Sequence, residues 1–321
     1  MTRILVTGGG GFIGSAMVAH LRRAYPDVIV RAMDITPPNG EANEYITGSI
    51  LDETDLSLAI RGCDYVIHLA AALGVRQTEN RPLHCLTVNI QGTRNVLDVC
   101  VKERVKKVVL ASSSEVYGEA AVQPISEETP HHPKSVYGVS KLAAEEYVRG
   151  YADHYGLDHS VVRYFNVYGP RQKAEFVIPR FIAAIQRGHP PVVYGDGSQV
   201  RAFCYVDDVA VGTAAALFEE SASGQVFNVG NPHTSISMAD LARKAIALLG
   251  GRGEPSFVPM SQSDRSERRE IYARIPDISK AERVLGYKPK VDLDEGIRRV
   301  AAAGPVDDTL MDTGRLRGIW T

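Results

Sequence analysis

Near its start the chain reads Arg3-Ile-Leu-Val-Thr-Gly-Gly-Gly-Gly-Phe-Ile-Gly14, and no other segment constrains its architecture as strongly. The apolar run Ile4-Leu-Val6 predicts a short buried strand, and the residues after Gly14 have helical spacing. A strand, a glycine-rich turn and a helix, in this order, form the phosphate cradle of dinucleotide-binding folds. Gly8 would permit the tight turn, Gly11 would let the backbone approach a pyrophosphate, and Gly14 would let the helix pack closely on the strand.

An acidic residue lies at the distance from this turn that ribose binding requires. Asp34 ends the second predicted strand, about 20 residues after Gly14, so its carboxylate can accept hydrogen bonds from both ribose hydroxyls. The residues that follow, Ile35, Thr36 and Pro37, include no Arg or Lys to pair with a 2′-phosphate. The pattern therefore predicts NAD, rather than NADP, as the cofactor.

Short apolar runs alternate with helical patterns through the first half of the chain. The predicted strands are Arg3–Thr7, Ile29–Met33, Tyr65–Leu69, Lys107–Ser112 and Ser160–Tyr164, and the predicted helices are Gly14–Ala24, Asp55–Ile60, Val88–Glu103 and Ser140–Tyr155. Apolar strands separated by helices are typical of a parallel sheet covered on both faces. We therefore expect an α/β fold with a doubly wound parallel sheet.

The regular alternation weakens after about residue 166, where prolines punctuate shorter elements. Helical spacing returns at Leu241–Leu249 and at Ser279–Leu285, which is followed by Gly286. We expect residues 1–170 to form the dinucleotide-binding domain, with residues 198–229 returning to it. Residues 171–197 and 230–321 would form a smaller α/β region that binds the substrate.

Composition excludes several classes of function. The formal charge of −2 gives no global attraction to nucleic acid or to anionic lipid. The four cysteines form no C-x-x-C pair, which favours reduced thiols over disulfides or a metal site. No signal peptide and no membrane-spanning stretch is recognisable. We expect a cytoplasmic protein without a metal, a membrane partner or a nucleic-acid partner.

A second constellation carries chemistry. Tyr137-Gly-Val-Ser-Lys141 places a phenol and an ammonium one turn apart on a helix face. A nearby lysine cation, together with the positive nicotinamide of bound NAD, would favour the phenolate and lower the tyrosine pKa toward that of a usable base. The strand that ends in the serine run 112–114 delivers hydroxyls to its C-terminal end, where ligands bind in open α/β sheets.

Motifs along most of the chain complete a known pattern. They are Thr7-Gly-Gly-Gly-Gly-Phe-Ile-Gly14, His68-Leu-Ala-Ala71, Asn89 with Gly92-Thr93, Ser112-Ser-Ser-Glu-Val-Tyr-Gly118, Tyr137-x-x-x-Lys141 and Arg163-Tyr-Phe-Asn-Val-Tyr-Gly-Pro170. From residue 3 to about 290 the chain resembles the extended short-chain dehydrogenase/reductases, in particular the NAD-dependent nucleotide-sugar epimerase/dehydratase family. The resemblance implies a Rossmann-type fold and a nucleoside-diphosphate sugar as substrate.

The resemblance also implies residue roles. Ser113, Tyr137, Lys141 and Glu115 would be catalytic. The cofactor-binding residues would be Gly8, Gly11, Phe12, Ile13, Gly14, Asp34, Ile50, Asp52, Leu69, Ala70, Ala71, Asn89, Tyr137, Lys141 and Tyr164. The substrate-binding residues would be Asn166, Phe176, Val193, Tyr194, Arg201 and Arg274. One departure concerns the adenine contacts, because Gly48-Ser49 stands where the family often has Gly-Asp, so that Asp52 or the Ile50 backbone would take over.

The reaction depends on one further carboxylate. Oxidation at the sugar C4 followed by reduction on the other face, which is 4-epimerisation of a UDP-hexose or UDP-hexuronate, requires only Ser113, Tyr137 and Lys141. Glu115 resembles the carboxylate that acts at C5 in sugar 4,6-dehydratases and in UDP-glucuronate decarboxylases. We expect an epimerase, with decarboxylation or dehydration through Glu115 as the alternative.

Two expectations concern the oligomeric state and the possibility of a non-enzymatic role. A non-enzymatic NAD-sensing regulator would usually lack the tyrosine or the lysine of the catalytic pair, and both are present. The apolar faces of Val88–Glu103 and Ser140–Tyr155 resemble the four-helix dimer contact of the family. We therefore expect an enzyme that forms a homodimer.

Overall fold

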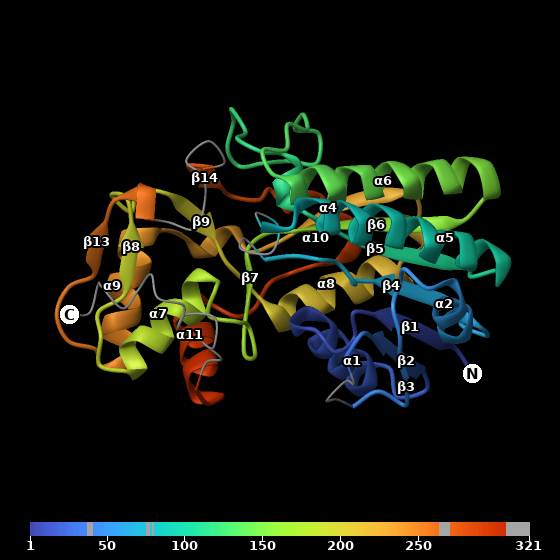
Figure 1. Ribbon diagram of the computed structural model, residues 1–321, viewed down its shortest axis with the longest axis horizontal. Coiled ribbons are helices and arrows are strands. Elements are labelled where there is room, and N and C mark those ends of the chain that lie inside the picture. The colour runs from blue at the N-terminus through green and yellow to red at the C-terminus, as the bar shows by residue number, and fades with distance from the viewer. Residues whose placement is uncertain (37–40, 75–77, 79, 263–269, 306–321) are drawn as a thin grey trace.

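The computed structural model describes residues 1–36, 41–74, 78, 80–262 and 270–305. Its central feature is a sheet of seven parallel strands in the order β11-β6-β5-β4-β1-β2-β3 (Figure 1). The strands are β1 (Arg3–Thr7), β2 (Ile29–Asp34), β3 (Glu44–Thr47), β4 (Tyr65–His68), β5 (Lys107–Ser113), β6 (Asp158–Tyr164) and β11 (Gln225–Val229). The expected doubly wound α/β fold is confirmed.

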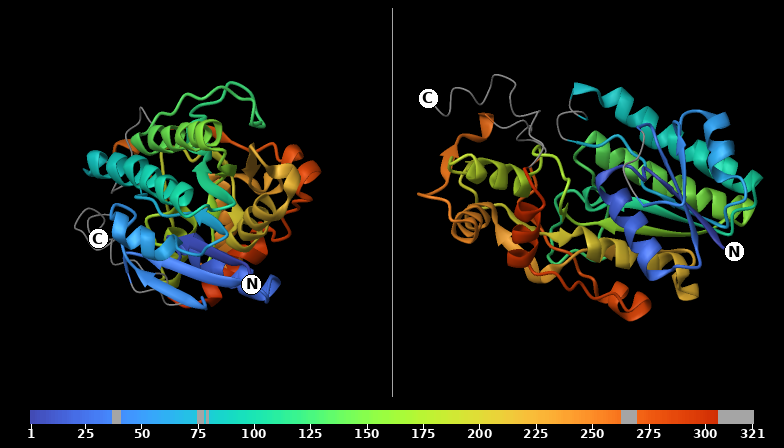
Figure 2. Two further views of the ribbon diagram at one scale, coloured as in Figure 1. Left: turned by 90° about the vertical axis from the view of Figure 1, so that its right-hand side faces the viewer. Right: turned by 90° about the horizontal axis from the view of Figure 1, so that it is seen from below.

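Helices cover both faces of this sheet (Figures 1 and 2). One face carries α2 (Glu53–Ile60), α5 (Gly92–Lys102) and α6 (Val136–Tyr155), with the shorter α4 (Pro82–Leu86) packed on α6. The other face carries α1 (Phe12–Ala24), α8 (Val206–Phe218) and α10 (Ser279–Leu285). Two separate apolar clusters fill the spaces between the sheet and these layers, so each face has its own core.

Two strands of the sheet were not predicted. Strand β3 lies at the edge and alternates between half-buried and exposed residues, so it lacks an apolar run. Strand β11 pairs in parallel with β6 and reaches the sheet from beyond residue 220. The predicted helix over residues 88–103 is a π-helical turn, η1 (Thr87–Gln91), continued by α5. Helix α6 begins earlier than expected, at Val136, because the Ser135 hydroxyl caps its N-terminus.

A smaller region lies beside the C-terminal ends of the sheet strands (Figure 2). Its strands form three small sheets: β7 (Val167–Tyr168) with β10 (Cys204–Tyr205), β8 (Val192–Tyr194) with β13 (Ser256–Val258), and β9 (Val200–Ala202) between β12 (Ser235–Ser237) and β14 (Ala273–Arg274). Its helices α7 (Val177–Gln186), α9 (Met238–Leu249) and α11 (Leu293–Ala302) surround a third apolar cluster. Besides η1, the described chain has the short helical turns η2 (Ser114–Val116) after β5, η3 (Glu220–Ala222) after α8, η4 (Pro232–Thr234) and η5 (Met260–Gln262). In the part of the chain that the structure describes, no helix combines the length and apolar character needed to cross a membrane.

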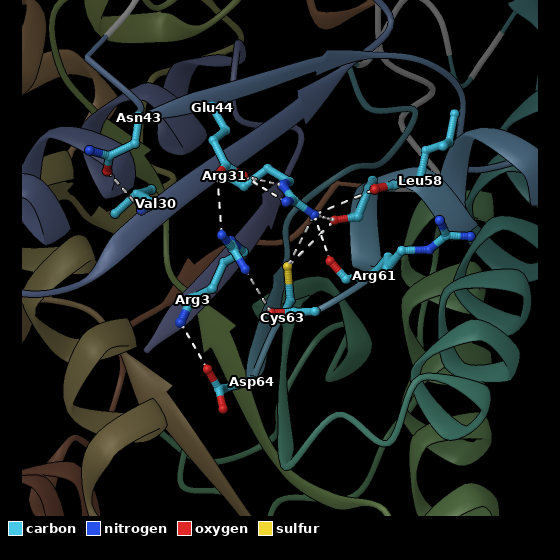
Figure 3. A network of polar contacts seen from close by, with 11 residues as sticks. Arg3, Val30, Arg31, Asn43, Glu44, Leu58, Arg61, Cys63 and Asp64 are labelled. Atoms are coloured by element: carbon cyan, nitrogen blue, oxygen red, sulfur yellow. Dashed lines mark hydrogen bonds and ion pairs between the residues drawn. The ribbon is translucent and has the colours of Figure 1, made fainter. Parts of the chain in front are cut away.

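A partly buried arginine on β2, Arg31, joins β2 and the edge strand β3 to α2 (Figure 3). The Arg31 guanidinium donates to the carbonyl oxygens of Ala59 and Arg61, 2.7 and 2.9 Å away, and lies 2.6 Å from the Glu44 carboxylate. It therefore satisfies carbonyls at the C-terminus of α2, where a cation is favoured.

We predict that Arg31→Met lowers the free energy of unfolding by about 2 to 3 kcal/mol, because charge-assisted bonds to partly buried acceptors are lost. Urea titration measures the change. Arg94→Met is the control, since the Arg94–Asp98 pair is half exposed and spans one helical turn, and its loss should cost about 0.5 kcal/mol or less. Equal effects of the two substitutions would contradict the capping role.

Candidate active site

A cleft of about 860 Å³ lies between the C-terminal ends of the sheet strands and the smaller region. Its walls include the glycine turn after β1, the end of β2, the segment after β4, the end of β5 and the start of α6. Elements α7, β8, β9 and β14 contribute the far side. Ligand binding at this edge is the rule for open parallel sheets.

The glycine turn has the geometry of a phosphate cradle. Gly8 adopts a left-handed φ of 70°, and a side chain there would reach within 2.8 Å of the Ala70 backbone nitrogen. Gly11 precedes α1 with extended backbone angles, and no side chain caps that helix. Gly8, Gly11, Phe12, Ile13 and Gly14 all line the cleft. The uncapped first turn leaves its N–H groups and the positive end of the helix dipole for an anion.

Asp34 lies beside this cradle at the end of β2. One carboxylate oxygen accepts a hydrogen bond of 3.0 Å from the Gly10 backbone N–H. The other accepts weaker bonds, 3.3 and 3.4 Å long, from the backbone and hydroxyl of Thr36. Thr36 and Ile35 carry no positive charge, and Pro37 lies outside the described residues. A carboxylate fixed next to an anion cradle fits the ribose and pyrophosphate of a dinucleotide.

The other predicted cofactor residues divide into those that line the cleft and those behind its wall. Ile50, Leu69, Ala70, Ala71 and Tyr164 line it. Asp52 does not, because its carboxylate caps α2 through the backbone N–H groups of Thr54 and Asp55. Of the two candidates for the adenine side, Ile50 is therefore the one that the geometry favours. The Tyr164 hydroxyl turns away from the cleft to Thr213, 2.8 Å distant.

Asn89 supports the wall from behind. It is 2% exposed, and its side-chain amide accepts from the backbone N–H of Ala72 and donates to the carbonyl of the same residue, at 2.7 and 3.1 Å. It also donates to the Ser140 hydroxyl on α6. Asn89 thus ties the segment after β4 to the helix that carries Tyr137.

Three of the four predicted catalytic residues, Ser113, Tyr137 and Lys141, meet on one wall. Ser113 ends β5, Tyr137 lies in the first turn of α6, and Lys141 lies one turn later. All three line the cleft. The Lys141 ammonium donates to the Ala111 carbonyl oxygen at 2.8 Å and lies 5.8 Å from the centre of the Tyr137 ring.

Burial dominates the pKa values of the ionisable groups on this wall. Burial, reinforced by the Glu115 carboxylate, raises the pKa of Tyr137, while a hydrogen bond with Ser113 opposes that change. Burial lowers the pKa of Lys141 to about 8, partly offset by Cys85 and Glu145. Desolvation therefore dominates the pKa of Tyr137 in the protein alone. The expectation joins the Lys141 cation to the positive nicotinamide of bound NAD, and that combined effect stays a prediction.

Glu115 lies in the same cleft but is already engaged. Its carboxylate accepts a hydrogen bond of 2.5 Å from the Ser135 hydroxyl. It also lies 3.9 Å from the Arg274 guanidinium, which comes from β14 of the smaller region. Glu115 therefore joins the catalytic wall to the opposite wall. Sequence reasoning missed Ser135, although a serine before an apolar helix is an N-cap signal.

The predicted substrate residues converge on the far side of the cleft. All of them line it: Asn166, Phe176, Val193, Tyr194, Arg201 and Arg274. Arg201 and Arg274 are register partners on the neighbouring strands β9 and β14, and both are 7% exposed. Asn166 holds a strained φ of 37° and donates to the Ala202 carbonyl at 2.9 Å.

Two charged residues of this wall were not predicted. Glu270 forms an ion pair of 3.1 Å with Arg201. The Arg180 guanidinium on α7 lies 4.9 Å from the centre of the Tyr194 ring. Neither belongs to a local motif, so only the folded chain brings them to the site. The Arg180 contact is a cation–π interaction that fixes one face of the tyrosine.

Comparison with known proteins agrees with this geometry. Residues 4–230 match the NAD dependent epimerase/dehydratase family. A putative UDP-glucose 4-epimerase from Methanocaldococcus jannaschii is 38% identical over 307 residues, which cover 92% of this chain and 96% of the relative. A UDP-N-acetyl-alpha-D-glucosaminuronate decarboxylase from Bacillus cytotoxicus is 35% identical over 313 residues, which cover 92% of this chain and 95% of the relative.

Solved structures extend the likeness to three dimensions. The crystal structure of a UDP-glucose 4-epimerase from Thermotoga maritima, with UDP-glucose, superposes with a TM-score of 0.85 at 33% identity. It covers 94% of this chain and 98% of its own. Fold, site and relatives together define an extended short-chain dehydrogenase/reductase. The chain belongs to the NAD-dependent epimerase/dehydratase family, and its cofactor is NAD.

Proposed function

We propose that this chain is an NAD-dependent 4-epimerase of a UDP-hexose or a UDP-hexuronate. The observation that carries the proposal is the meeting of Ser113, Tyr137 and Lys141 on one wall of the cleft that also contains the glycine cradle. With NAD as the hydride acceptor, these three residues supply the acid–base groups that reversible oxidation at one carbinol carbon requires. The relatives named UDP-glucose 4-epimerase support the same assignment.

Each residue of the wall has a proposed role. Tyr137 takes the proton of the C4 hydroxyl, and Ser113 shares that proton through its hydrogen bond with the phenol. When bound, NAD supplies a reversible acceptor for the hydride of C4, and its positive nicotinamide favours the phenolate form of Tyr137. Lys141 adds a second positive charge below the ring. A 4-keto sugar that turns over and is reduced on its other face leaves as the 4-epimer.

We assign the far wall to the nucleotide sugar. Arg201 and Arg274 lie side by side on adjacent strands, although like charges repel. Such a pair suits a dianionic diphosphate, which guanidinium groups bind through paired hydrogen bonds. Tyr194, stacked on Arg180, offers its other face to a base. We propose that residues 171–197 and 230–321 form the substrate region and residues 1–170 and 198–229 the cofactor domain; residues 263–269 and 306–321 lie outside the described residues. Two elements cross this division, because β9, which carries Arg201, pairs with strands of the smaller region, whereas α10 packs on α8 and β11 of the large sheet.

The product mass tests the proposal. The purified protein is incubated with UDP-glucose and, separately, with UDP-glucuronate, and the products are analysed by mass spectrometry and NMR. We expect an isomer of unchanged mass with inverted configuration at C4. Loss of carbon dioxide would instead establish a decarboxylase, and loss of water a dehydratase.

Decarboxylation of a UDP-hexuronate is the second candidate, and one contact favours it. The Glu115 carboxylate and the Arg274 guanidinium face each other at 3.9 Å, next to the catalytic wall. Such a pair could handle a proton and a carboxylate at the sugar C5 and C6. The relative from Bacillus cytotoxicus, named a decarboxylase, adds support.

We predict that Glu115→Gln lowers the 4-epimerase kcat by less than about 10-fold, because epimerisation needs no group at C5 and the amide keeps the bond with Ser135. A decarboxylase that uses Glu115 at C5 would lose about 100-fold or more. Steady-state kinetics on the substrate identified above measures the effect. A loss of the larger size would move the assignment from epimerase to lyase.

A further inference from the structure

One face of α6 carries three polar residues spaced by four. Tyr137, Lys141 and Glu145 follow one another at successive turns, so they point to the same side of the helix. Two of them belong to the proposed chemistry, and the third does not. Glu145 is 1% exposed and lies about two turns from the substrate end of the helix.

The three residues bond in turn to the last three residues of β5. The Ser113 hydroxyl interacts with the Tyr137 phenol and opposes the rise of its pKa. Lys141 donates to the carbonyl oxygen of Ala111. Glu145 accepts a hydrogen bond from the Ser112 hydroxyl. The helix that carries Tyr137 is therefore joined to the strand that ends in Ser113 by a ladder of three side-chain contacts, two of which are hydrogen bonds to β5.

Glu145 is itself fixed by a second strand. The Arg163 guanidinium, 2% exposed on β6, binds both carboxylate oxygens at 3.0 and 2.7 Å. Ser112 and Arg163 are register partners on β5 and β6, so Glu145 holds adjacent strands with one carboxylate. Arg163 also donates to the Tyr117 hydroxyl at 2.8 Å and to the Glu127 carbonyl oxygen at 3.3 Å.

A fully buried ion pair of this kind is a poor choice for stability alone. Removing two charges from water has a large free-energy cost that their mutual attraction often fails to exceed. Such a pair does fix the relative position of the two elements that carry it, since a two-point guanidinium–carboxylate contact tolerates little displacement. Here the pair fixes the position of the helix that carries Tyr137 and Lys141.

We propose that Glu145 is a positioning residue of the active site. Its carboxylate, held by Arg163 and Ser112, keeps α6 in register with the end of β5, so that Tyr137 meets Ser113 at the substrate hydroxyl. Its charge also supports the cationic form of Lys141, which the ladder places one turn away. This inference rests on the proposed function of Tyr137 and Lys141.

The first test removes one bond of the ladder. Ser112→Ala leaves the Glu145–Arg163 pair intact, and we expect kcat to fall about 10-fold with KM within about 2-fold, because misplaced reacting groups affect the transition state more than binding. Ser160→Ala is the control. Its buried hydroxyl also bonds internally, but to the carbonyls of Ala216 in α8 and Ala222 in η3, on the face of the sheet that α8 covers. It should match Ser112→Ala in lost stability while keeping kcat within about 2-fold.

The second test measures how the charge of Glu145 affects the protonation of Lys141. The groups that act on Lys141 are Tyr137 and Glu145 on α6, Cys85 on α4 and His68 on β4. Glu145 itself faces Arg163, Ser112 and, more distantly, His131. The Glu145 carboxylate opposes the burial that lowers the pKa of Lys141 to about 8. In Glu145→Gln that opposition is lost, so the lysine loses its proton at a lower pH.

We therefore expect Glu145→Gln to move the alkaline limb of kcat against pH to lower pH, with its acidic limb unchanged. A purely structural role would lower the amount of folded enzyme without moving either limb. An unmoved limb in folded Glu145→Gln, or a wild-type kcat in Ser112→Ala, would overturn the proposal. Ser112→Ala decides the outcome where Glu145→Gln does not fold, since that substitution leaves Arg163 buried without its partner.

The failure of this inference is separable from failure of the proposed function. If Tyr137→Phe abolishes turnover while Ser112→Ala and Ser160→Ala both keep wild-type kcat, only the positioning role is wrong. If Tyr137→Phe turns over normally, the chemical assignment is wrong and the ladder has no catalytic group to position.

Discussion

Replacing Tyr137 with Phe is expected to lower kcat about 1,000-fold or more, the range found when a general acid–base group is removed. The phenol is the group on the catalytic wall that bonds to Ser113 and lies above the Lys141 ammonium. Phe keeps the ring and its packing, so NAD should still bind within about 3-fold of the wild-type Kd. Stopped-flow or steady-state kinetics gives kcat, and isothermal titration calorimetry gives the affinity for NAD.

A second tyrosine supplies the control for this experiment. The Tyr287 hydroxyl is buried outside the cleft lining and donates to the Gly230 carbonyl at 3.1 Å. Tyr287→Phe therefore removes a buried phenol hydroxyl of similar structural value and should leave kcat within about 2-fold. A Tyr137→Phe enzyme that is no slower than this control would refute Tyr137 as the proton acceptor.

The parts of the site that the sequence predicts are those encoded by local backbone requirements. The glycine turn, Asp34 and the Tyr137–Lys141 pair each depend on a few neighbouring residues and on one strand or helix. Their spacing is therefore visible before the fold is known. The ends of β1, β2 and β5 lie at the same edge of one sheet, which brings these local signals together.

The parts that were missed depend on contacts between distant segments. Strand β11 joins the sheet only through β6, some 65 residues earlier, as in the pairing of Gln225 with Ser160. Glu270 reaches the site through its ion pair with Arg201, and Arg180 through the Tyr194 ring. A single charged residue on a surface-like segment carries no local signal of such a partner.

The pKa of Tyr137 is a further property that depends on distant segments and therefore cannot be predicted from local sequence. The sequence places a lysine one helical turn away, which by itself favours the phenolate. The fold adds desolvation and the Glu115 carboxylate, and both act in the opposite direction. Local spacing identifies which groups interact, whereas burial, which decides the sign of the result, arises from the whole chain.

Gly14 offers the sharpest test of the cofactor cradle. A Cβ there would overlap the Gly8 carbonyl oxygen and reach within 2.8 Å of the Gly9 Cα. Both neighbours are backbone atoms of the turn that would receive the pyrophosphate, so neither can move without deforming the cradle. We expect Gly14→Ala to weaken NAD binding about 100-fold, the scale associated with displacements near 1 Å. Overpacking should also lower the free energy of unfolding by about 1 to 3 kcal/mol.

Gly150 on α6 provides the matched control, because a Cβ added there meets no atom within 4 Å. Gly150→Ala should leave the Kd for NAD unchanged and raise the free energy of unfolding by about 0.5 to 1 kcal/mol, since alanine favours a helix. Calorimetry measures both affinities, and urea unfolding measures both stabilities. The two substitutions add the same methyl group to helical glycines, so a difference between them isolates the close approach of α1 to the turn. If Gly14→Ala binds NAD as tightly as Gly150→Ala does, the turn after β1 is not the pyrophosphate site.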